Sequence, residues 1–210
     1  MIRVLVVDDH SIVREGWRQL LDKTDNIRVK GEAADAGEAF DAVNKGRWDV
    51  VIVDLNLPDR SGIDLLKDIK RVHSKLPVLI LSVHPEEEYG IRVLRAGAAG
   101  YLNKAAAPDE LVTAVRKVCA GGRYISLAMA ELLAFRLDED AEASPHDVLS
   151  DREYQVMCMM AMGKAGVDIA AELNLSPKTI SSFRTRILEK MNLKTNADII
   201  RYALRNNLVE

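Results

Sequence analysis

The sequence has few cysteines and no long apolar run, and these absences exclude several classes of protein. Cys119 and Cys158 are the two cysteines among 210 residues, and each lies within an apolar helical pattern. This pattern predicts reduced cysteines in a hydrophobic core and argues against a disulfide or a metal-binding pair. The longest early apolar run, Val4 to Val7, ends in two acids, so we expect no signal peptide, no membrane span and a cytoplasmic protein.

An excess of positive charge is also absent, although the charge is unevenly distributed. The formal net charge of −3 argues against a protein coated with basic residues for binding nucleic acid. Residues 149–210 contain nine Lys and Arg against seven Asp and Glu, a charge of +2, so residues 1–148 carry −5. This asymmetry indicates an acidic regulatory or catalytic part joined to a mildly basic binding part.

Short apolar runs predict a parallel sheet that is buried on both faces. The run from Val50 to Val53 consists of β-branched residues and leads directly into Asp54. Amphipathic helical patterns separate this run from the others, which indicates right-handed crossovers and helices on both faces of the sheet. The expected strands are residues 2–7, 27–32, 50–53, 78–81 and 97–102.

A small helical domain is expected after a linker. Residues 125–137 have a helical pattern, whereas residues 138–147 are acidic and contain Ser144-Pro145, as is typical of an exposed linker. Ser150 and Glu153 form a capping box that starts the second domain. Further helices are expected at about 151–162, 167–173, 177–191 and 196–206. The predicted division is a first domain at 1–121, a linker with a helix at 122–148, and a second domain at 149–210.

Polar side chains stand at the carboxyl ends of four predicted strands, where open parallel sheets bind their ligands. Converging carboxylates raise one another's pKa, so a divalent cation that prefers oxygen ligands is their natural counter-charge. A hydroxyl and an ammonium can contact phosphoryl oxygens, and a carboxylate can act as the nucleophile that forms an acyl phosphate. Each residue alone has an ordinary explanation as a helix cap or a solvated side chain, but their combination favours a phosphate and metal site. The residues are Asp8, Asp9, Asp54, Ser82 and Lys104.

Residues 167–191 have the spacing of a helix-turn-helix, whose second helix enters the major groove of DNA. Ser176 is a good N-cap for the second helix, and Pro177 is well placed in its first turn. Residues 178–194 contain five basic residues and one acid, a local charge of +4 that suits contacts to phosphates and base edges. An ordinary solvated helix face is the alternative. The predicted DNA contacts are Lys178, Thr179, Ser181, Ser182, Thr185, Arg186, Lys190 and Lys194.

The predicted fold is therefore α/β, a five-stranded parallel doubly wound domain followed by a small all-α helix-turn-helix domain. Residues 1–121 resemble the receiver domain of bacterial two-component response regulators, and residues 149–210 resemble the helix-turn-helix output domain of the NarL/FixJ family. The residues that carry the receiver resemblance are Asp8, Asp9, Asp54, Ser82, Tyr101 and Lys104.

The resemblance implies a role for each residue of the site. Asp54 would be the phosphoacceptor for a sensor histidine kinase, and Lys104 would pair with the phosphoryl oxygens. Asp9, Asp54 and the backbone carbonyl of Asn56 would bind Mg²⁺, with Asp8 acting mainly through water. Ser82 and Tyr101 would be the switch residues. The implied partners are the kinase and promoter DNA, with a homodimer when the protein is phosphorylated or bound to DNA, and no membrane.

The sequence departs from the family pattern at four positions. Ala105 follows Lys104 where many receivers have proline, and Asp168 stands where glutamate is usual. Phe183 replaces a frequent histidine at a position that faces the core, and Asn196 replaces a common arginine, which removes one candidate phosphate contact.

Two other functions are weighed against this interpretation. A phosphohydrolase of the haloacid-dehalogenase type would use Asp54 as nucleophile and a second acid two residues later as general acid and base. Asn56 occupies that position, and a side-chain amide cannot transfer a proton at neutral pH. A protein-interaction adaptor that no longer binds DNA is the other alternative, and the +4 segment argues against it. We predict a phosphorylation-regulated transcription factor and not an enzyme.

Overall fold

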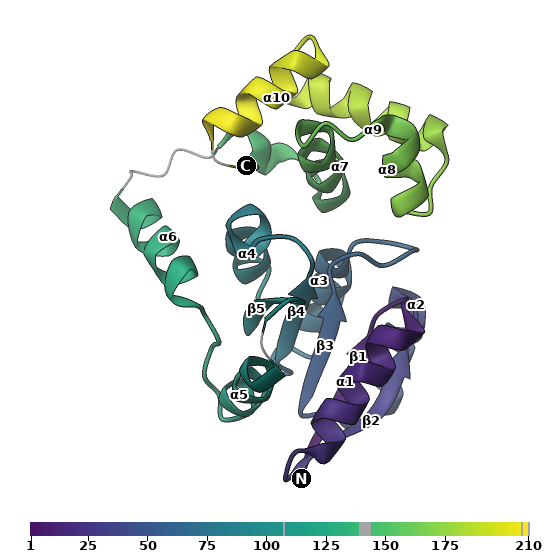
Figure 1. The fold of residues 1–210 in the computed structure, drawn as a ribbon, viewed down its shortest axis with the longest axis vertical. Coiled ribbons are helices and arrows are strands. Elements are labelled where there is room, and N and C mark those ends of the chain that lie inside the picture. The colour runs from purple at the N-terminus through teal and green to yellow at the C-terminus, as the bar shows by residue number, and fades with distance from the viewer. Residues whose placement is uncertain (107, 139–143, 207, 210) are drawn as a thin grey trace. The chain divides into compact units, whose positions relative to one another are not determined.

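The computed structural model describes residues 1–106, 108–138, 144–206, 208 and 209. Within these residues, five parallel strands form one sheet in the order β2-β1-β3-β4-β5 (Figure 1). This order confirms the predicted doubly wound class, because the chain winds outward from β1 in both directions. The strands are β1 (Ile2–Val7), β2 (Ile27–Ala33), β3 (Val50–Asp54), β4 (Val78–Ser82) and β5 (Gly100–Asn103).

Helices alternate with the strands and cover the sheet. One hydrophobic cluster joins Leu21 of α1 and Leu111 of α5 to Val6 and Ile52 of the sheet. The helices α2 and α3 contact each other on the opposite face (Figure 1). The bounds are α1 (Ser11–Lys23), α2 (Ala36–Lys45), α3 (Gly62–Val72), α4 (Glu86–Arg95) and α5 (Pro108–Cys119).

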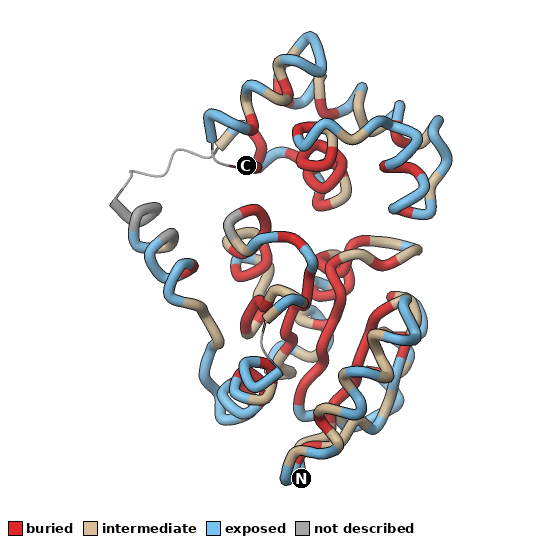
Figure 2. Tube along the Cα trace, in the orientation of Figure 1, coloured by how far each residue is buried: buried red, intermediate tan, exposed pale blue. Residues whose placement is uncertain are grey.

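The central strand β3 is buried along its whole length (Figure 2). Its residues from Val50 to Val53 are at most 1% exposed, which explains why this strand is apolar without alternation. Val7 pairs with Val53, and Ser82 pairs with Asn103. The carboxyl ends of β1, β3, β4 and β5 therefore meet at one edge of the sheet.

Gly62 lets α3 start directly against the strand that carries Asp54. The Gly62 amide donates a hydrogen bond of 2.8 Å to the carbonyl of Leu55. A Cβ atom on Gly62 would lie 2.1 Å from the carbonyl oxygen of Asp54. Because that distance is far shorter than van der Waals contact, the approach requires glycine.

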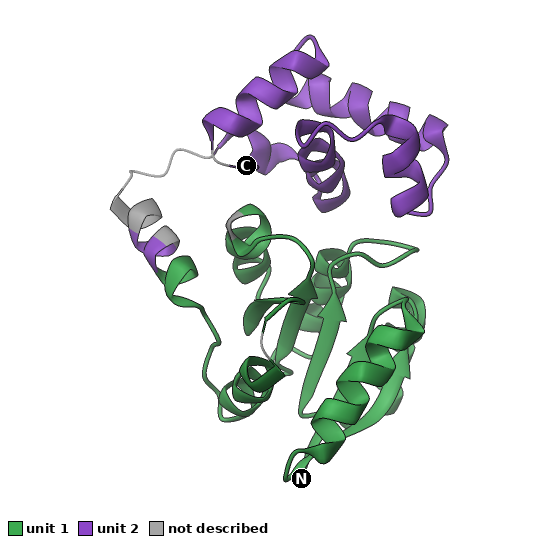
Figure 3. Ribbon diagram, in the orientation of Figure 1, with its two compact units in different colours: residues 1–130 green, residues 131–210 purple. Residues whose placement is uncertain are grey.

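The remaining helices lie in a second compact unit, apart from residues 127–130 at the start of one of them, which lie in the first. Contacts within the chain divide it into residues 1–130 and 131–210 (Figure 3), while the predicted boundaries at 121 and 149 stay predictions. The helix α7 contacts α8, α9 and α10. No helix among the described residues is both long and apolar enough to cross a bilayer. The elements are α6 (Leu127–Asp138), the 3-10 helix η1 (Pro145–Val148), α7 (Asp151–Ala161), α8 (Gly166–Glu172), α9 (Pro177–Lys190) and α10 (Asn196–Arg205).

Part of the predicted exposed linker is packed into the second unit. His146 is 6% exposed, its Nδ1 lies 2.9 Å from the hydroxyl of Tyr202, and its ring contacts the ring of Tyr154. The prediction of exposure is therefore wrong at His146, because its partner Tyr202 is distant in the sequence. Residues 139–143 of the predicted acidic linker lie outside the described residues.

Two apolar positions are less buried than their patterns suggest. Cys158 is fully buried, as predicted, but Cys119 is only half-buried at the end of α5. Ile12 fits the helical apolar pattern of α1 and is nevertheless 87% exposed. Helical spacing shows which residues share a face, but it does not show where the covered part of that face ends.

We expect Gly62→Ala and Gly16→Ala to change the stability of the sheet domain in opposite directions. A methyl group on Gly62 collides with backbone, so this variant should lower the free energy of unfolding by about 1–3 kcal/mol. In α1, nothing lies within 4 Å of the Cβ position of Gly16, so alanine there should raise the free energy of unfolding by about 0.5–1 kcal/mol. Trp17 and Trp48, the two tryptophans of the chain, both lie in the sheet domain. Urea unfolding followed by tryptophan fluorescence therefore measures this domain, and equal stability of the two variants would contradict the close approach at Gly62.

Candidate functional site

An ammonium group joins two buried carboxylates at the carboxyl edge of the sheet. The Nζ of Lys104 lies 2.6 Å from Oδ2 of Asp8 and 2.7 Å from Oδ2 of Asp54. Asp8 is 2% exposed and Asp54 is 4% exposed. The three residues come from the ends of β1, β3 and β5, so the sheet topology brings together groups that are far apart in the sequence.

Burial and the neighbouring charges set the ionisation of this group. Burial raises the pKa of Asp54 to about 6, since the attraction of Lys104 does not fully offset desolvation and the repulsion from Asp8. Burial alone would lower the pKa of Lys104, but the two carboxylates outweigh it and raise that pKa. At neutral pH the pocket therefore holds an ionised Asp54 beside a firmly protonated lysine.

Asp9 adds a third carboxylate that is incompletely satisfied. Its buried Oδ1 accepts no hydrogen bond from any residue that the structure describes, although Nδ1 of His10 lies 2.7 Å away. Ligand atoms of Asp8, Asp9, His10 and Asp54 all lie within 4.8 Å of one another. A set of carboxylate oxygens with one unsatisfied member fits a hard divalent cation such as Mg²⁺.

The loop after β3 carries the predicted metal ligand Asn56. Its backbone amide donates to Oδ1 of Asp54 at 3.3 Å, and it forms an isolated bridge with Ser61. The side-chain nitrogen Nδ2 of Asn56 lies 3.4 Å from Nε2 of His84. Asn56 therefore lies beside the carboxylate pocket, and its role as a metal ligand stays a prediction.

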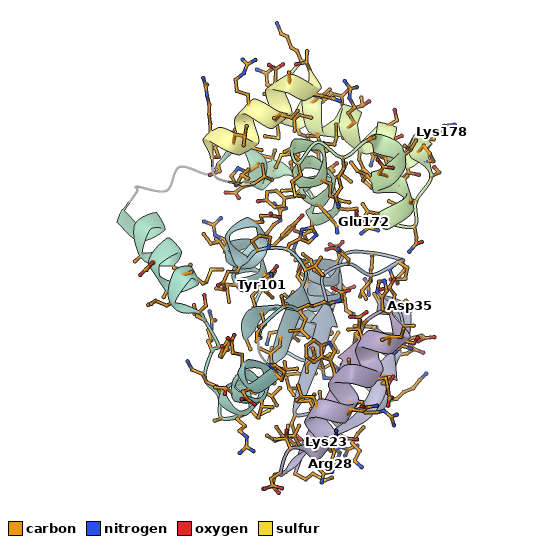
Figure 4. The ribbon with its side chains drawn as sticks, viewed as in Figure 1. Lys23, Arg28, Asp35, Tyr101, Glu172 and Lys178 are labelled. Carbon is orange, nitrogen blue, oxygen red and sulfur yellow. The ribbon has the colours of Figure 1, made fainter. Side chains whose placement is uncertain are left out.

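The two predicted switch residues contact the same loop. Ser82 is fully buried and its Oγ accepts from the amide of His84 at 3.1 Å. Tyr101, labelled in Figure 4, is 2% exposed and its hydroxyl donates to the carbonyl of His84 at 2.8 Å. Burial raises the pKa of Tyr101, so its hydroxyl remains a hydrogen-bond donor at physiological pH. Both residues face inward, and His84 connects them.

His10 and His84 are the two site residues that the sequence analysis missed. His10 directly follows the acid pair, and this position was a usable signal for a further ligand. His84 is 6% exposed, and its Nδ1 lies 3.4 Å from the buried carboxylate of Glu88. No local pattern marks His84, because its contacts to Asn56 and Tyr101 come from other strands.

The second unit contains the predicted helix-turn-helix at α8 and α9. The Oγ of Ser176 accepts from the amide of Thr179 at 3.1 Å, which confirms the N-cap of α9. Ile180 and Ile187 are at most 3% exposed and hold α9 against α7 and α8. Phe183, predicted to face the core, is half-buried. The opposite face of α9 is left to solvent.

The residues predicted to contact DNA differ in their exposure and in whether their side chains already have partners within the protein. Lys178, labelled in Figure 4, Arg186 and Lys194 are exposed and make no ion pair with any described residue. In contrast, Nζ of Lys190 lies 2.6 Å from Oε2 of Glu153, the buried carboxylate of the α7 capping box. The hydroxyls of Ser182 and Thr185 donate to backbone carbonyls one turn earlier in α9, and Thr179 is half-buried. Ser181 is exposed.

Comparison with known proteins identifies both parts of the chain. Residues 4–116 match the response regulator receiver domain, and residues 147–203 match the bacterial regulatory proteins of the luxR family. Over 209 residues the chain is 38% identical to response regulator UvrY of Escherichia coli K12, which covers 99% of this chain and 96% of UvrY. It is 37% identical to response regulator GacA of Pseudomonas protegens, over 100% of this chain and 99% of GacA.

A solved structure shows the same two-part similarity. RcsB from Salmonella enterica serovar Typhimurium, bound to promoter rprA in the presence of the phosphomimetic BeF₃⁻, has a TM-score of 0.63 and 28% sequence identity. The similarity covers 96% of this chain and 98% of that one. These relatives are response regulators and not enzymes. The chain therefore belongs to the two-component response regulators of the NarL/FixJ family, in which a receiver domain is joined to a luxR-type DNA-binding output domain.

Proposed function

We propose that Asp54 accepts a phosphoryl group from a sensor histidine kinase and that phosphorylation controls the binding of promoter DNA by α9. The observation that carries this proposal is the buried Asp54 carboxylate, which lies 2.7 Å from Lys104 at the carboxyl edge of the sheet. This arrangement places a nucleophile and a cation at one point, with the hydroxyl of Ser82 in the adjacent strand.

The transfer needs an ionised Asp54 and a counter-charge for the incoming phosphoryl group. An oxygen of Asp54 attacks phosphorus while the bond to the kinase imidazole breaks, which leaves an acyl phosphate on the carboxylate. Asp9, Asp54 and the Asn56 carbonyl would hold Mg²⁺, with Asp8 acting mainly through water, and the ion would supply further positive charge there. Lys104 is then free to leave Asp54 and pair with a phosphoryl oxygen.

Ser82 and Tyr101 respond to the new group. The Ser82 hydroxyl now accepts from the backbone of His84, and turning it toward the phosphoryl group would provide a further hydrogen bond. Tyr101 keeps the loop in place through its bond to the His84 carbonyl. The added charge of the phosphoryl group can therefore change the position of the β4–α4 loop.

The exposed face of α9 is the proposed DNA interface. Lys178, Arg186 and Lys194 provide unpaired positive charge for phosphates, and Ser181 and Ser182 lie on the same exposed side. Lys190 pairs with Glu153 of α7, so its charge serves the packing of α9 on α7 before any contact to DNA. We also propose that the protein binds DNA as a homodimer, because dimers of helix-turn-helix domains bind paired half-sites.

We expect acetyl phosphate to label the protein in the presence of Mg²⁺, and Asp54→Asn to abolish the labelling because Asp54 contacts Lys104 at the end of β3, next to the strand that carries Ser82. The matched control is Asp49→Asn, at the opposite end of the same strand, where Asp49 accepts from the amide of Arg3. Intact-mass measurement detects the added phosphoryl group. Labelling of Asp54→Asn would mean that Asp54 is not the phosphoacceptor. Full labelling in excess EDTA would mean that the reaction needs no metal.

The raised pKa of Asp54 predicts a pH-dependent stability without metal. A carboxyl whose folded-state pKa is about 6, above its ordinary 3.8, stabilises the fold at low pH, and this contribution is lost as the pH rises through 6. In EDTA, Asp54→Asn should therefore be about as stable as the wild type near pH 4 and more stable by about 1–3 kcal/mol at pH 8. Urea unfolding at both pH values tests this. The idea fails if the variant gains nothing at pH 8, or if Asp49→Asn gains as much.

Replacing Lys178, Ser182 and Arg186 together by alanine should weaken DNA binding and reduce its salt dependence. Each lost phosphate contact lowers the slope of log K against log salt by about one unit. The probe is a duplex selected from random oligonucleotides by the wild-type protein. Lys23→Ala combined with Lys30→Ala removes the same net charge from the receiver domain and should leave the slope unchanged. Wild-type affinity of the triple variant would show that another face binds DNA.

A further inference from the structure

We propose that residues 124–129, here called the strap, couple α4 and β5 to the linker helix α6. The strap follows α5 and includes the first turn of α6, and residues 124–129 all belong to the same compact unit as the sheet. Three separate contacts hold the strap on α4 and β5. The inference rests on the proposed function, because it states how phosphorylation at Asp54 reaches the linker that leads to the output domain.

The first contact adds Tyr124 to the edge of the sheet. Its amide donates to the carbonyl of Ala99 at 2.8 Å, and Tyr124 forms a parallel bridge with Gly100 of β5. A Cβ atom on Gly100 would lie 2.6 Å from the carbonyl oxygen of Tyr124. Glycine at this position therefore allows the strap to run directly beside β5.

The second contact ties the start of α6 to the start of α4. The hydroxyl of Ser126 donates to the carboxylate of Glu86, the first residue of α4. The same Oγ accepts from the amide of Met129 at 3.0 Å, so Ser126 is also the N-cap of α6. One side chain thus orients both helix starts.

The third contact places Met129 in a notch on α4. Met129 is 2% exposed, and a Cβ atom on Gly90 would lie 1.7 Å from the Met129 methyl carbon. Glycine is unfavourable in the middle of a helix, so its presence at this position needs a packing reason. Met129 provides that reason. Leu127, on the same turn of α6, is 77% exposed and takes no part in the contact.

These contacts flank the two switch residues. Gly100 directly precedes Tyr101, and Glu86 lies two residues after His84, whose carbonyl accepts the Tyr101 hydroxyl. A shift of the loop that follows Ser82 therefore moves the anchors on α4 and β5, and the strap moves with them. Since α6 begins inside the strap, its direction depends on the state of the phosphoacceptor site.

The test compares Gly90→Ala and Met129→Ala with the matched control Leu127→Ala in the full-length protein. The first measurement is labelling by acetyl phosphate, which should be unchanged in all variants because the strap does not touch the carboxylate pocket. The second is the ratio of DNA affinities with and without beryllofluoride and Mg²⁺, on the selected duplex. This ratio should be about 5- to 150-fold in the wild type. It should fall by roughly two- to thirtyfold in Gly90→Ala and Met129→Ala and stay at the wild-type value in Leu127→Ala.

A third measurement reports on the strap directly. Oxidation of Met129 by hydrogen peroxide, followed by peptide mass spectrometry, should be slow in the wild type and several-fold faster in Gly90→Ala. Wild-type affinity ratios in both Gly90→Ala and Met129→Ala would overturn the strap as the coupling element while leaving the proposed function intact. A ratio of one in the wild-type protein, despite full labelling, would instead overturn the proposed phosphorylation control and the strap with it.

Discussion

The contact of Lys104 with Asp8 and Asp54 is the interaction on which the receiver's chemistry depends. One ammonium faces three carboxylates at this edge of the sheet, so the pocket keeps an excess of negative charge even when the lysine is fully engaged. The cost of burying this charge appears in the raised pKa of Asp54. Under the proposed function a divalent cation would reduce that cost, and the phosphoryl group would then bring its own negative charge to a site where Lys104 could turn toward it. The rest of the receiver, from the order of its strands to Gly62, serves to place these groups together.

The apolar strands and their polar ends were predictable because both signals are local. A strand buried on both faces must be apolar throughout, and a charged residue directly after it must lie at the edge of the sheet. For this reason the sequence located Asp8, Asp54, Ser82 and Lys104, as well as the helix-turn-helix caps. These signals require no knowledge of which segments meet.

Several features that escaped the sequence analysis depend on partners that are distant in the chain. His146 fell in a stretch whose composition suggests a linker, but Tyr202 buries it. Lys190 belonged to a basic run, yet it neutralises Glu153, which the capping box holds below the surface. Gly90 forms a notch that Met129 fills, although the two residues are 39 positions apart in the chain. Neither residue is unusual by itself. Patterns in the sequence therefore identify the chemistry of the site, whereas the connections between sites require the fold.

The residue at position 56 explains why this pocket suits a regulator. An enzyme that hydrolyses an aspartyl phosphate rapidly needs an acid and base near the leaving and attacking oxygens. Asn56 offers an amide there, and its Nδ2 lies 3.4 Å from Nε2 of His84. Asp8 and Asp54 are both held by Lys104, and Asp9 lies against His10. The pocket therefore has no general acid and base at position 56, so under the proposed function an acyl phosphate on Asp54 would persist long enough for Ser82 and Tyr101 to change the loop that they share.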